Sequence, residues 1–497
     1  MKVAIIEPKR KRWDPERDEF WEFGYISRSF AVHHSKRFSA FSLSLVVLAS
    51  LCPSDVDVKI IDEYVEPIDF DEFFDLVLVT FFTLGATRAY EIGDQFRKKG
   101  VKVIFGGVHS SMLPEEAIQH ADSVAIGEAE EIIQDIFDDY RSGSLKQFYV
   151  APRKPSIENT PIPRWDKLKF DRYHNPTTQT SRGCPYSCEF CTVRAYFGSK
   201  YRYKPIEKAI EEIKFIKKLW PKDTFVMISD DDITANRGRA KSLFRSIIPL
   251  GIKWMGQGSL AMAKDDELLD LMAKSGGTRI IIGFESISPL ALEQMHKNPA
   301  NKAQQYAENI KTIQSHGVAV IGSFVVGFDN DDDSVFERTA DFIIKNHVAI
   351  PQFLILTPFP GTSLYKRLSE EGRILHRDWT KYTTSTVCFK PKKMSEETLQ
   401  NGYYNSLQKI FSYEGILERM EGLWSLWDEK SEVTTIKEKV DTLVLNLNFR
   451  DAAYRFPNHI KLDNQREKAA WGKIRQHLKE LLRSRRENRI AYLQEER

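Results

Sequence analysis

Cysteine is scarce in this sequence: its 497 residues include five, and three of them lie in one short segment. The other two, Cys52 and Cys388, are far apart, which excludes a disulfide framework and favours a reducing, cytoplasmic location. Long apolar runs are also absent, because the longest, Leu43 to Cys52, is too short to span a bilayer. The first residues predict a strand rather than a signal peptide. We therefore expect no transmembrane segment, while a peripheral membrane contact stays open.

The sequence also lacks an excess of one charge. Its 72 Lys and Arg residues nearly balance its 70 Asp and Glu residues, so the net charge is +2. No overall field then attracts nucleic acid, and we expect no nucleic-acid partner. Apolar residues (42%) and charged residues (29%) stand in the proportions of a folded soluble protein. A chain of 497 residues exceeds what one core accommodates, which predicts two or three domains.

Residues 1–145 alternate short apolar runs with helical patterns, which predicts an α/β domain with a doubly wound parallel sheet. The expected strands are Lys2–Glu7, Val58–Asp62, Leu76–Thr80, Lys102–Phe105 and Ser123–Ile126. Ligands of such sheets bind on the loops that follow the strands. Here those loops are Thr80–Thr83, Gly106–Ser111 and Gly127–Glu130, which supply glycines and hydroxyl groups.

Residues 146–177 are rich in proline and charge, and we expect a linker there without regular structure. The alternation of strands and helices then restarts and predicts most of a TIM-like barrel over residues 178–362. Its six strands are expected at Thr178–Ser181, Phe225–Ser229, Lys253–Gln257, Arg279–Glu285, Val318–Phe328 and Gln352–Thr357. Residues 363–497 show helical patterns with many charges, which predicts a mainly helical C-terminal region.

Three cysteines with C-x3-C-x2-C spacing, Cys184, Cys188 and Cys191, follow the first expected barrel strand. Three thiolates can hold three irons of a 4Fe–4S cluster and leave the fourth iron open for the amino and carboxylate groups of S-adenosylmethionine (SAM). The alternative, a structural zinc site, normally needs a fourth Cys or His at short spacing, and none is present. Active sites of barrels lie at this edge of the strands, so placement and chemistry agree.

This spacing, with an aromatic residue before the last cysteine, resembles the signature of the radical SAM superfamily. Motifs over nearly the whole chain are similar to its cobalamin-binding branch, which includes the hopanoid methylases and the anaerobic Mg-protoporphyrin ester ring cyclase. They are Asp62-Glu63, Gly106-Gly-Val-His-Ser-Ser, Ile126-Gly-Glu-Ala-Glu, Thr180-Ser-Arg-Gly-Cys, Ser229-Asp-Asp-Asp-Ile, Ile282-Gly-Phe-Glu-Ser, Val326-Gly-Phe-Asp and Leu356-Thr-Pro-Phe-Pro-Gly-Thr. The resemblance implies a cobalamin-binding-like (Rossmann or flavodoxin-like) domain, a six-stranded partial barrel and a helical C-terminal region.

The resemblance further implies a cobalamin-dependent radical SAM enzyme that methylates an unactivated carbon of an apolar or lipid-like substrate. In that family a 5′-deoxyadenosyl radical abstracts hydrogen, methylcobalamin delivers the methyl group, and a flavodoxin or ferredoxin donates electrons. A cyclase or oxidoreductase without methyl transfer stays open, as does a non-catalytic iron–sulfur or cobalamin sensor. A methylthiotransferase is excluded, because it needs three further N-terminal cysteines and Cys52 stands alone there. No acid or base residue is assigned, since radical hydrogen abstraction requires none.

Carboxylates at strand ends are the candidate SAM contacts of the barrel. By resemblance, Asp230 and Asp231 contact the SAM amino group, and the alternative is that Asp231 or Asp232 caps the next helix. Glu285 and Ser286 are expected near the SAM ribose or amino group. Gln257 either reaches the ribose or is a hydrogen-bonded amide inside the barrel.

The cysteine segment and its flank supply further candidates. Phe190 is expected beside the cofactor, and Gly183 and Pro185 are expected to shape the loop. Arg202 and Lys204 follow the loop, where they either pair with the SAM carboxylate or form a solvated basic pair.

Cobalamin contacts are expected on the loops of the N-terminal sheet. By resemblance the candidates are Thr83, Gly106, Gly107, Gly127 and Glu128. The Asp-x-His-x-x-Gly motif that ligates cobalt elsewhere is absent, because His109 lacks the preceding Asp. Cobalamin is therefore expected to bind without a protein histidine, and the alternative is a domain that keeps the fold alone. Phe38-Ser-Ala-Phe41 replaces the family's usual Pro-Pro before the first long helix.

Overall fold

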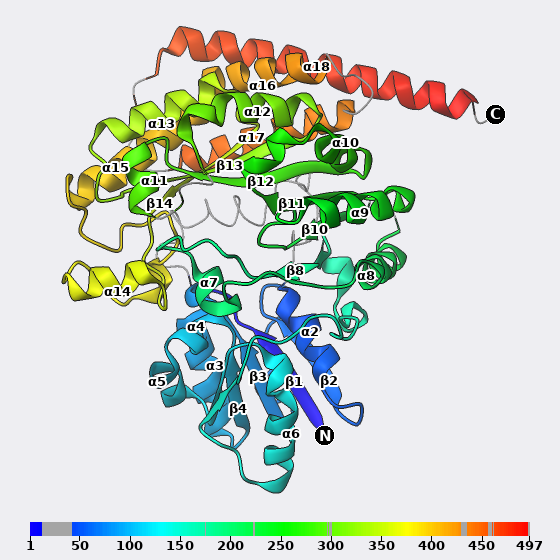
Figure 1. Cartoon of the computed structure of the whole chain (residues 1–497), viewed down its shortest axis with the longest axis vertical. Coiled ribbons are helices and arrows are strands. Elements are labelled where there is room, and N and C mark those ends of the chain that lie inside the picture. The colour runs from blue at the N-terminus through cyan, green and yellow to red at the C-terminus, as the bar shows by residue number, and fades with distance from the viewer. Residues whose placement is uncertain are drawn as a thin grey trace. The chain divides into compact units, whose positions relative to one another are not determined.

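The computed structural model (Figure 1) describes residues 1–11, 42–173, 175–221, 224–295, 297, 301–428, 435–455, 460 and 462–495, with side chains up to Ser484. These residues group into two compact units. The first unit contains residues 1–11, 42–233 and 357–390, and the second contains residues 234–356 and 391–495. The Phe38–Phe41 departure lies outside the described residues.

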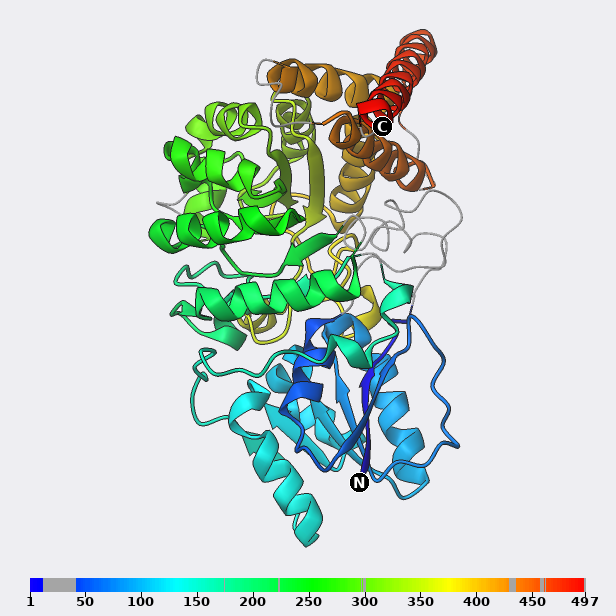
Figure 2. The same cartoon turned by 90° about the vertical axis from the view of Figure 1, so that its right-hand side faces the viewer.

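A parallel sheet with strand order β2-β1-β3-β4-β5-β6 forms one part of the first unit (Figure 1 and Figure 2). Its strands are β1 (Lys2–Glu7), β2 (Asp57–Asp62), β3 (Leu76–Thr80), β4 (Lys102–Gly106), β5 (Ser123–Ile126) and β6 (Phe148–Val150). β3 is buried at every position, as expected for a strand covered on both faces. The order reverses between β1 and β3, so the sheet is doubly wound as predicted.

One expectation for this sheet was wrong. β6 lies inside residues 146–177, where no regular element was expected, and it pairs in parallel with β5. Its middle residue, Tyr149, is buried and donates a hydrogen bond to Asp139 (2.9 Å). A strand of three residues is too short to show an alternating pattern, so pairing with the sheet decides its structure.

The second six-stranded sheet has the order β14-β13-β12-β11-β10-β7. Its strands are β7 (Thr177–Thr178), β10 (Phe225–Ile228), β11 (Lys253–Gly258), β12 (Gly277–Glu285), β13 (Ala319–Val326) and β14 (Ile350–Ile355). Helices follow the strands in the order α8 (Ile206–Leu219), α9 (Arg237–Ile247), α10 (Asp266–Lys274), α12 (Tyr306–Ser315) and α13 (Ser334–Lys345). This confirms the parallel partial barrel. The first expected strand is split, because Ser181–Arg182 forms a separate strand, β8, paired antiparallel with β9 (Arg202–Tyr203).

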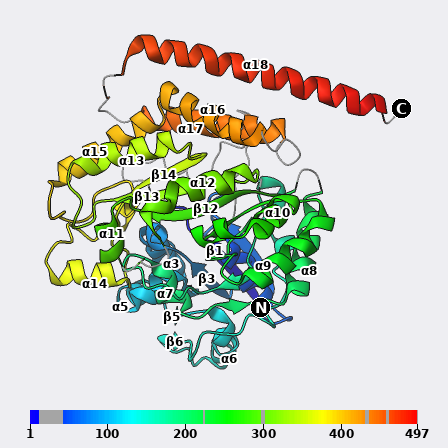
Figure 3. The same ribbon diagram turned by 45° about the horizontal axis from the view of Figure 1, so that its top comes forward.

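The C-terminal part is helical, as predicted, and consists of α14 (Ser363–Glu370), α15 (Glu396–Ile410), α16 (Tyr413–Asp428), α17 (Ile436–Ala453) and α18 (Asn464–Glu495). In the second unit, α18 packs along α16 and α17 (Figure 3). The buried Arg419 of α16 donates to the Val348 carbonyl (3.1 Å) and to Asn446 of α17 (2.8 Å). Among the described residues, no helix combines the length and the apolar character needed to cross a membrane.

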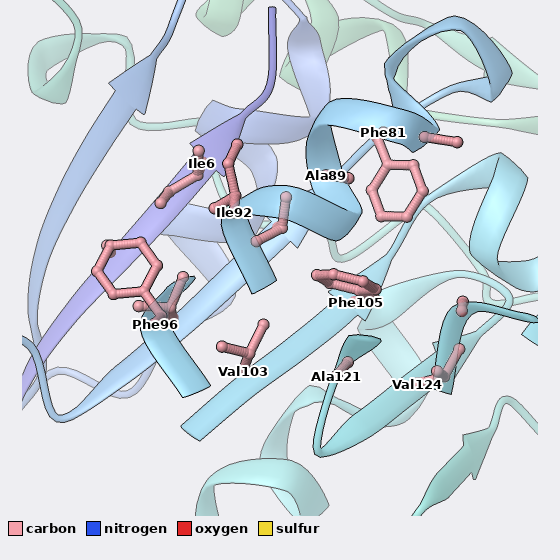
Figure 4. Close-up of a cluster of buried hydrophobic side chains, with 14 of the residues drawn as sticks. Ile6, Phe81, Ala89, Ile92, Phe96, Val103, Phe105, Ala121 and Val124 are labelled. Carbon is pink, nitrogen blue, oxygen red and sulfur yellow. The ribbon is translucent and has the colours of Figure 1, made fainter. Parts of the chain in front are cut away.

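The core of the first unit lies between its six-stranded sheet and α3 (Ala86–Lys98) (Figure 4). Phe96 and Ile92 of α3 face Val103 and Phe105 of β4, and all four are fully buried. Gly93 lets the helix approach closely, since a Cβ there would lie 2.2 Å from the His120 carbonyl oxygen. This packing fixes the carboxyl ends of the strands, where the candidate loops begin.

A segment from late in the chain completes this core. Trp379, Tyr382 and Cys388 are buried in the same cluster as the sheet residues. The Trp379 indole donates a hydrogen bond to Glu116 (2.7 Å), a residue of the short helix after β4. Residues 357–390 therefore belong structurally to the first unit.

Candidate functional site

The three cysteines lie on one loop between β8 and β9, and each is partly exposed. The Cys184 amide donates to the Gly198 carbonyl (3.2 Å), and the Cys191 amide donates to the Cys188 carbonyl (3.1 Å). Helix α7 (Thr192–Phe197) begins directly after Cys191. The antiparallel pair β8–β9 closes the base of this segment, which we call the cysteine loop (residues 183–201).

Gly183 is required by the geometry at the start of the cysteine loop. Its φ is +94°, and a Cβ there would lie 2.3 Å from the Lys200 carbonyl oxygen. Any side chain would strain the backbone and clash with the other end of the loop. This observation supports the expected loop-shaping role of Gly183.

Among the described residues, no group of three His, Cys, Asp or Glu side chains is gathered to hold one metal ion. In a 4Fe–4S cluster each thiolate binds a different iron. Cys388 is buried, and burial raises the pKa of its thiol, so it is not available as a fourth ligand. Cluster ligation by Cys184, Cys188 and Cys191 stays a prediction.

Asp230 holds the strand that leads into the cysteine loop. Its carboxylate is 2% exposed. It accepts hydrogen bonds from the amide and hydroxyl of Thr180 (2.5 and 2.6 Å) and from those of Ser181 (3.0 and 2.8 Å). A carboxylate has about four acceptor positions, and these hydrogen bonds occupy all of them. This arrangement gives Asp230 a structural role, and its SAM contact stays a prediction.

Asp231 differs from its neighbour in having capacity left. Its Oδ2 accepts the Gly183 amide (2.8 Å), and no described residue donates to its Oδ1. Burial raises the pKa of this carboxyl to about 6, and the charge of Asp230 adds to the rise. Burial also raises the pKa of the Cys184 thiol, with Asp231 as a further cause, which places the two side chains near each other. Its SAM contact stays a prediction that this geometry favours.

Glu128 was expected to contact cobalamin, and it instead pairs with the base of the cysteine loop. It is 2% exposed. Its carboxylate accepts bonds from Arg182 of β8 (2.7 Å) and from both terminal nitrogens of Arg202 of β9 (3.0 and 2.8 Å). Arg202 is therefore not a solvated charge, and its SAM contact stays a prediction.

Lys204 is likewise neither solvated nor free for a ligand. It is 6% exposed and pairs with Glu212 of α8. Glu212 also accepts a hydrogen bond from the Thr178 hydroxyl (2.9 Å). The pair therefore fastens α8 to β7.

Glu189, between the second and third cysteines, was missed in the sequence. It forms a bidentate pair with Arg367 of α14 (3.0 and 3.1 Å), and its carbonyl accepts the Leu364 amide (2.8 Å). Its neighbour Phe190 is partly exposed. The sequence did show a single acid inside the cysteine motif. Its partner, Arg367, lies too far along the chain to be identified from the sequence.

The expected cobalamin loops do come together at the carboxyl ends of β3, β4 and β5. Gly107 has φ +93°, and a Cβ there would lie 2.8 Å from the Phe81 backbone. The Gly127 amide donates to the Ser111 hydroxyl (3.0 Å), which in turn donates to the Gly107 carbonyl (2.7 Å). Gly106, Gly107 and Gly127 are partly exposed. Their contact with a corrinoid stays a prediction.

His109 is not placed to ligate a metal. It is fully buried, with Nδ1 3.2 Å from the Thr83 hydroxyl and Nε2 3.1 Å from the Tyr90 hydroxyl. Its ring packs against Trp379, with centroids 5.1 Å apart. Both ring nitrogens and the Thr83 hydroxyl are therefore engaged inside the protein.

Two carboxyl groups lie side by side at the ends of β1 and β2, and the sequence reasoning missed the first of them. Glu7 ends β1 and is the register partner of Asp62, which ends β2. Burial raises the pKa of Glu7 to about 8, and the nearby Asp62 adds to the rise. Asp62 accepts a hydrogen bond from the Tyr173 hydroxyl (2.7 Å). An acid at the end of an otherwise apolar strand was the signal for Glu7.

The second unit carries the remaining candidates at the ends of β11 and β12. Glu285 has φ +63°, next to a break in the register with β13, and its Oε1 lies 2.5 Å from the Lys297 ammonium. The Ser286 hydroxyl accepts the Ser288 amide (3.1 Å). Gln257 is exposed, so it is not a buried amide. Their SAM contacts stay predictions.

Two family models match parts of the chain. A model described as the radical SAM superfamily matches residues 178–343. A second model, described as a domain of unknown function (DUF4070), matches residues 362–456.

Several curated proteins are similar over most of the chain. Bacteriochlorophyllide d C-12(1)-methyltransferase of Chlorobaculum tepidum is 33% identical over 390 residues, which are 76% of this chain and 84% of that protein. Hopanoid C-2 methylase of Rhodopseudomonas palustris is 26% identical, with 67% and 65% covered. Anaerobic magnesium-protoporphyrin IX monomethyl ester cyclase of Rubrivivax gelatinosus is 22% identical, with 67% and 64% covered. The resemblance to these groups is confirmed.

Solved structures share the fold. The cobalamin-dependent S-adenosylmethionine radical enzyme OxsB, solved with aqua-cobalamin and S-adenosylmethionine, has a TM-score of 0.64 and 14% identity, covering 98% of this chain and 80% of that one. The radical S-adenosylmethionine methyltransferase TsrM of Kitasatospora setae, solved with cobalamin and a [4Fe-4S] cluster, has a TM-score of 0.59 and 13% identity, covering 95% and 99%.

Proposed function

The chain belongs to the radical SAM superfamily, and on this premise we propose that it is a cobalamin-dependent methyltransferase acting on an unactivated carbon of an apolar small molecule. The similarity to the bacteriochlorophyllide methyltransferase carries the proposal, because it covers 76% of this chain at 33% identity. We propose that residues 1–145 bind the corrinoid and that residues 178–362 bind the cluster and SAM.

The cysteine loop supplies the first part of the site. Cys184, Cys188 and Cys191 would hold a 4Fe–4S cluster, since three partly exposed thiols share one loop and no described fourth ligand accompanies them. When bound, the cluster supplies an electron that cleaves SAM, and a corrinoid carries the methyl group. Asp231 is assigned to the SAM ammonium in preference to Asp230, because its Oδ1 accepts no described donor.

The carboxyl edge of the N-terminal sheet supplies the corrinoid part. Its glycines permit close approach of a ligand to the backbone at the ends of β4 and β5. Phe82, which follows β3, is 60% exposed and offers an apolar surface at the same edge. Because His109 is buried and engaged, the corrinoid would bind without a histidine ligand from this loop.

An apolar carbon skeleton is the proposed substrate class. Two of the similar methyltransferases are named for a bacteriochlorophyllide and for a hopanoid, which supports this substrate class. Methyl transfer is favoured over ring closure, because the cyclase relatives are less similar than the methyltransferases. We further propose a cytoplasmic enzyme that receives electrons from a flavodoxin or ferredoxin.

Corrinoid content tests the proposal most directly. The full chain is expressed anaerobically with hydroxocobalamin, and cobalt, corrinoid and iron are measured per chain. We expect about one corrinoid and four irons per chain. With deuterated-methyl SAM and a reductant, a tetrapyrrole or triterpenoid acceptor should gain the labelled methyl group. An intact cluster without corrinoid would overturn the cobalamin assignment. Loss of the substrate's hydrogens without methyl gain would favour the cyclase or oxidoreductase reaction.

A further inference from the structure

We infer that Glu128 is a positioning residue for the cysteine loop, acting as a charge clamp on both strands at its base. This assignment replaces the expected corrinoid contact of Glu128. It depends on the proposed function only in taking the cysteine loop as the cluster site. The ion pairs themselves are independent of any cofactor.

The clamp compensates two like charges that the pairing of β8 with β9 brings side by side. Arg182 of β8 and Arg202 of β9 are direct cross-strand partners. Like charges in that relation repel each other, and more strongly when they are shielded from water. Both guanidinium groups are largely buried, with side-chain exposures of 10% and 13%. A paired arrangement of β8 and β9 therefore requires an anion beside them.

Glu128, on the loop that follows β5, supplies that anion. Oε2 accepts from both Arg182 (2.7 Å) and Arg202 (3.0 Å), while Oε1 accepts from Arg202 (2.8 Å). Both carboxylate oxygens are therefore bonded to the two arginines that flank the cysteine loop. With 2% of its surface exposed, it offers little to a ligand at the edge of the sheet.

Neighbouring contacts strengthen the same attachment. Glu130 adds a second anion to Arg182 (2.7 Å). Tyr196, inside the cysteine loop on α7, donates to the Gly127 carbonyl (2.9 Å). The loop after β5 thus holds the cysteine loop at both ends and at its helix. The conformation of the cysteine loop therefore depends on contacts at the carboxyl edge of the N-terminal sheet, where the corrinoid is proposed to bind.

The test compares Glu128→Gln with Glu131→Gln in the full chain. Glu131 pairs with Arg153, which is 77% exposed, so it controls for loss of a nearby surface ion pair. Hydrogen–deuterium exchange of residues 183–201 reports on the loop, and exchange of β3 checks the fold. We expect Glu128→Gln to speed loop exchange at least about tenfold, and to broaden the EPR signal of the reduced cluster. Glu131→Gln should match the unchanged protein.

A second variant tests charge compensation itself. Adding Arg202→Gln to Glu128→Gln removes one of the two positive charges that repel each other. Exchange of the cysteine loop should then return to within about threefold of that in the original protein. If Glu128→Gln leaves both loop exchange and the EPR signal unchanged, the inference is wrong. Lost corrinoid binding with an unchanged loop would instead make Glu128 a corrinoid contact. If the unmodified protein binds no corrinoid, the proposed function fails, while the exchange measurement still decides the clamp.

Discussion

The cysteine loop and the carboxyl end of β12 hold their acidic side chains in different ways. Around the loop, Asp230 accepts four hydrogen bonds, and Glu128 and Glu189 each bind an arginine through both oxygens. At the end of β12, Glu285 bonds to Lys297 through Oε1 and has a left-handed backbone, φ +63°. Such a backbone costs about 1–3 kcal/mol and is typical of functional positions.

This difference separates acids that hold the structure from acids that remain available. An acid whose oxygens are all engaged fixes a loop, and its loss leaves buried donors without partners. An acid on a strained backbone can accept a ligand when one of its carboxylate oxygens is not engaged. On this criterion Asp231 and Glu285 are the better candidates for SAM.

Removing a cysteine should have the largest effect. In Cys188→Ala the iron content and SAM cleavage should fall to background, because the cluster loses one of three ligands. The matched control is Cys52→Ala, whose thiol donates to the Leu48 carbonyl and lies outside the loop. Iron analysis and 5′-deoxyadenosine formation measure the outcome. A full cluster in Cys188→Ala would contradict the assignment of this loop.

Substitution of the two neighbouring aspartates should separate structure from binding. Asp230→Ala should lower the free energy of unfolding by about 3 kcal/mol, since Thr180 and Ser181 lose a buried, charged acceptor. Asp231→Ala should lower it by about 1 kcal/mol, because one amide bond is lost, and should weaken SAM binding. Denaturant titrations and SAM affinities measure both. Equal losses of stability would remove the distinction drawn between these acids.

Glu285→Gln should weaken SAM binding. We expect about tenfold weaker SAM binding, or about 1.4 kcal/mol, together with a loss of stability from the largely buried pair with Lys297. Glu293→Gln, an exposed acid on the helix after β12, serves as the control. Isothermal titration with the reconstituted protein measures the affinities. Unchanged SAM affinity in Glu285→Gln would show that the strained strand end does not bind SAM.

The last expected effect is a change in pH dependence from Glu7. Its pKa is raised from 4.5 to about 8, so between these values the folded protein binds more protons than the unfolded chain. The free energy of unfolding should therefore fall as pH rises from about 4.5 to about 8 through this group. Glu7→Gln should remove that part of the slope. Denaturant titrations at pH 5 and pH 8 measure it, and an unchanged slope would place the Glu7 carboxyl in water.

Much of the fold was predictable because the strands are buried on both faces. Continuous apolar runs such as Leu76–Thr80 and Lys2–Glu7 predicted β3 and β1 with the observed bounds. The three-residue β6 was not predictable, because its pairing with β5 has no local signature. Loops at the ends of adjacent parallel strands were correctly expected to come together.

The roles of single acids were harder to predict. Asp230 and Asp231 are identical neighbours in the sequence, and only the backbone directs the first toward Thr180 and the second toward Gly183. Glu128 lies 54 positions before Arg182, and no periodicity connects them. Ion pairs between distant segments depend on the fold, so the sequence motif did not reveal the arginine partners of Glu128.

The late segment in the first core has a consequence for how the chain is made. Trp379, Tyr382 and Cys388 join a cluster that begins with Ala4 and Ile6. During synthesis the N-terminal sheet leaves the ribosome long before these side chains exist, so it must wait with part of its apolar surface uncovered. A nascent chain arrested before Trp379 should therefore resist protease poorly. The sheet would acquire its full resistance once the chain has grown past Cys388.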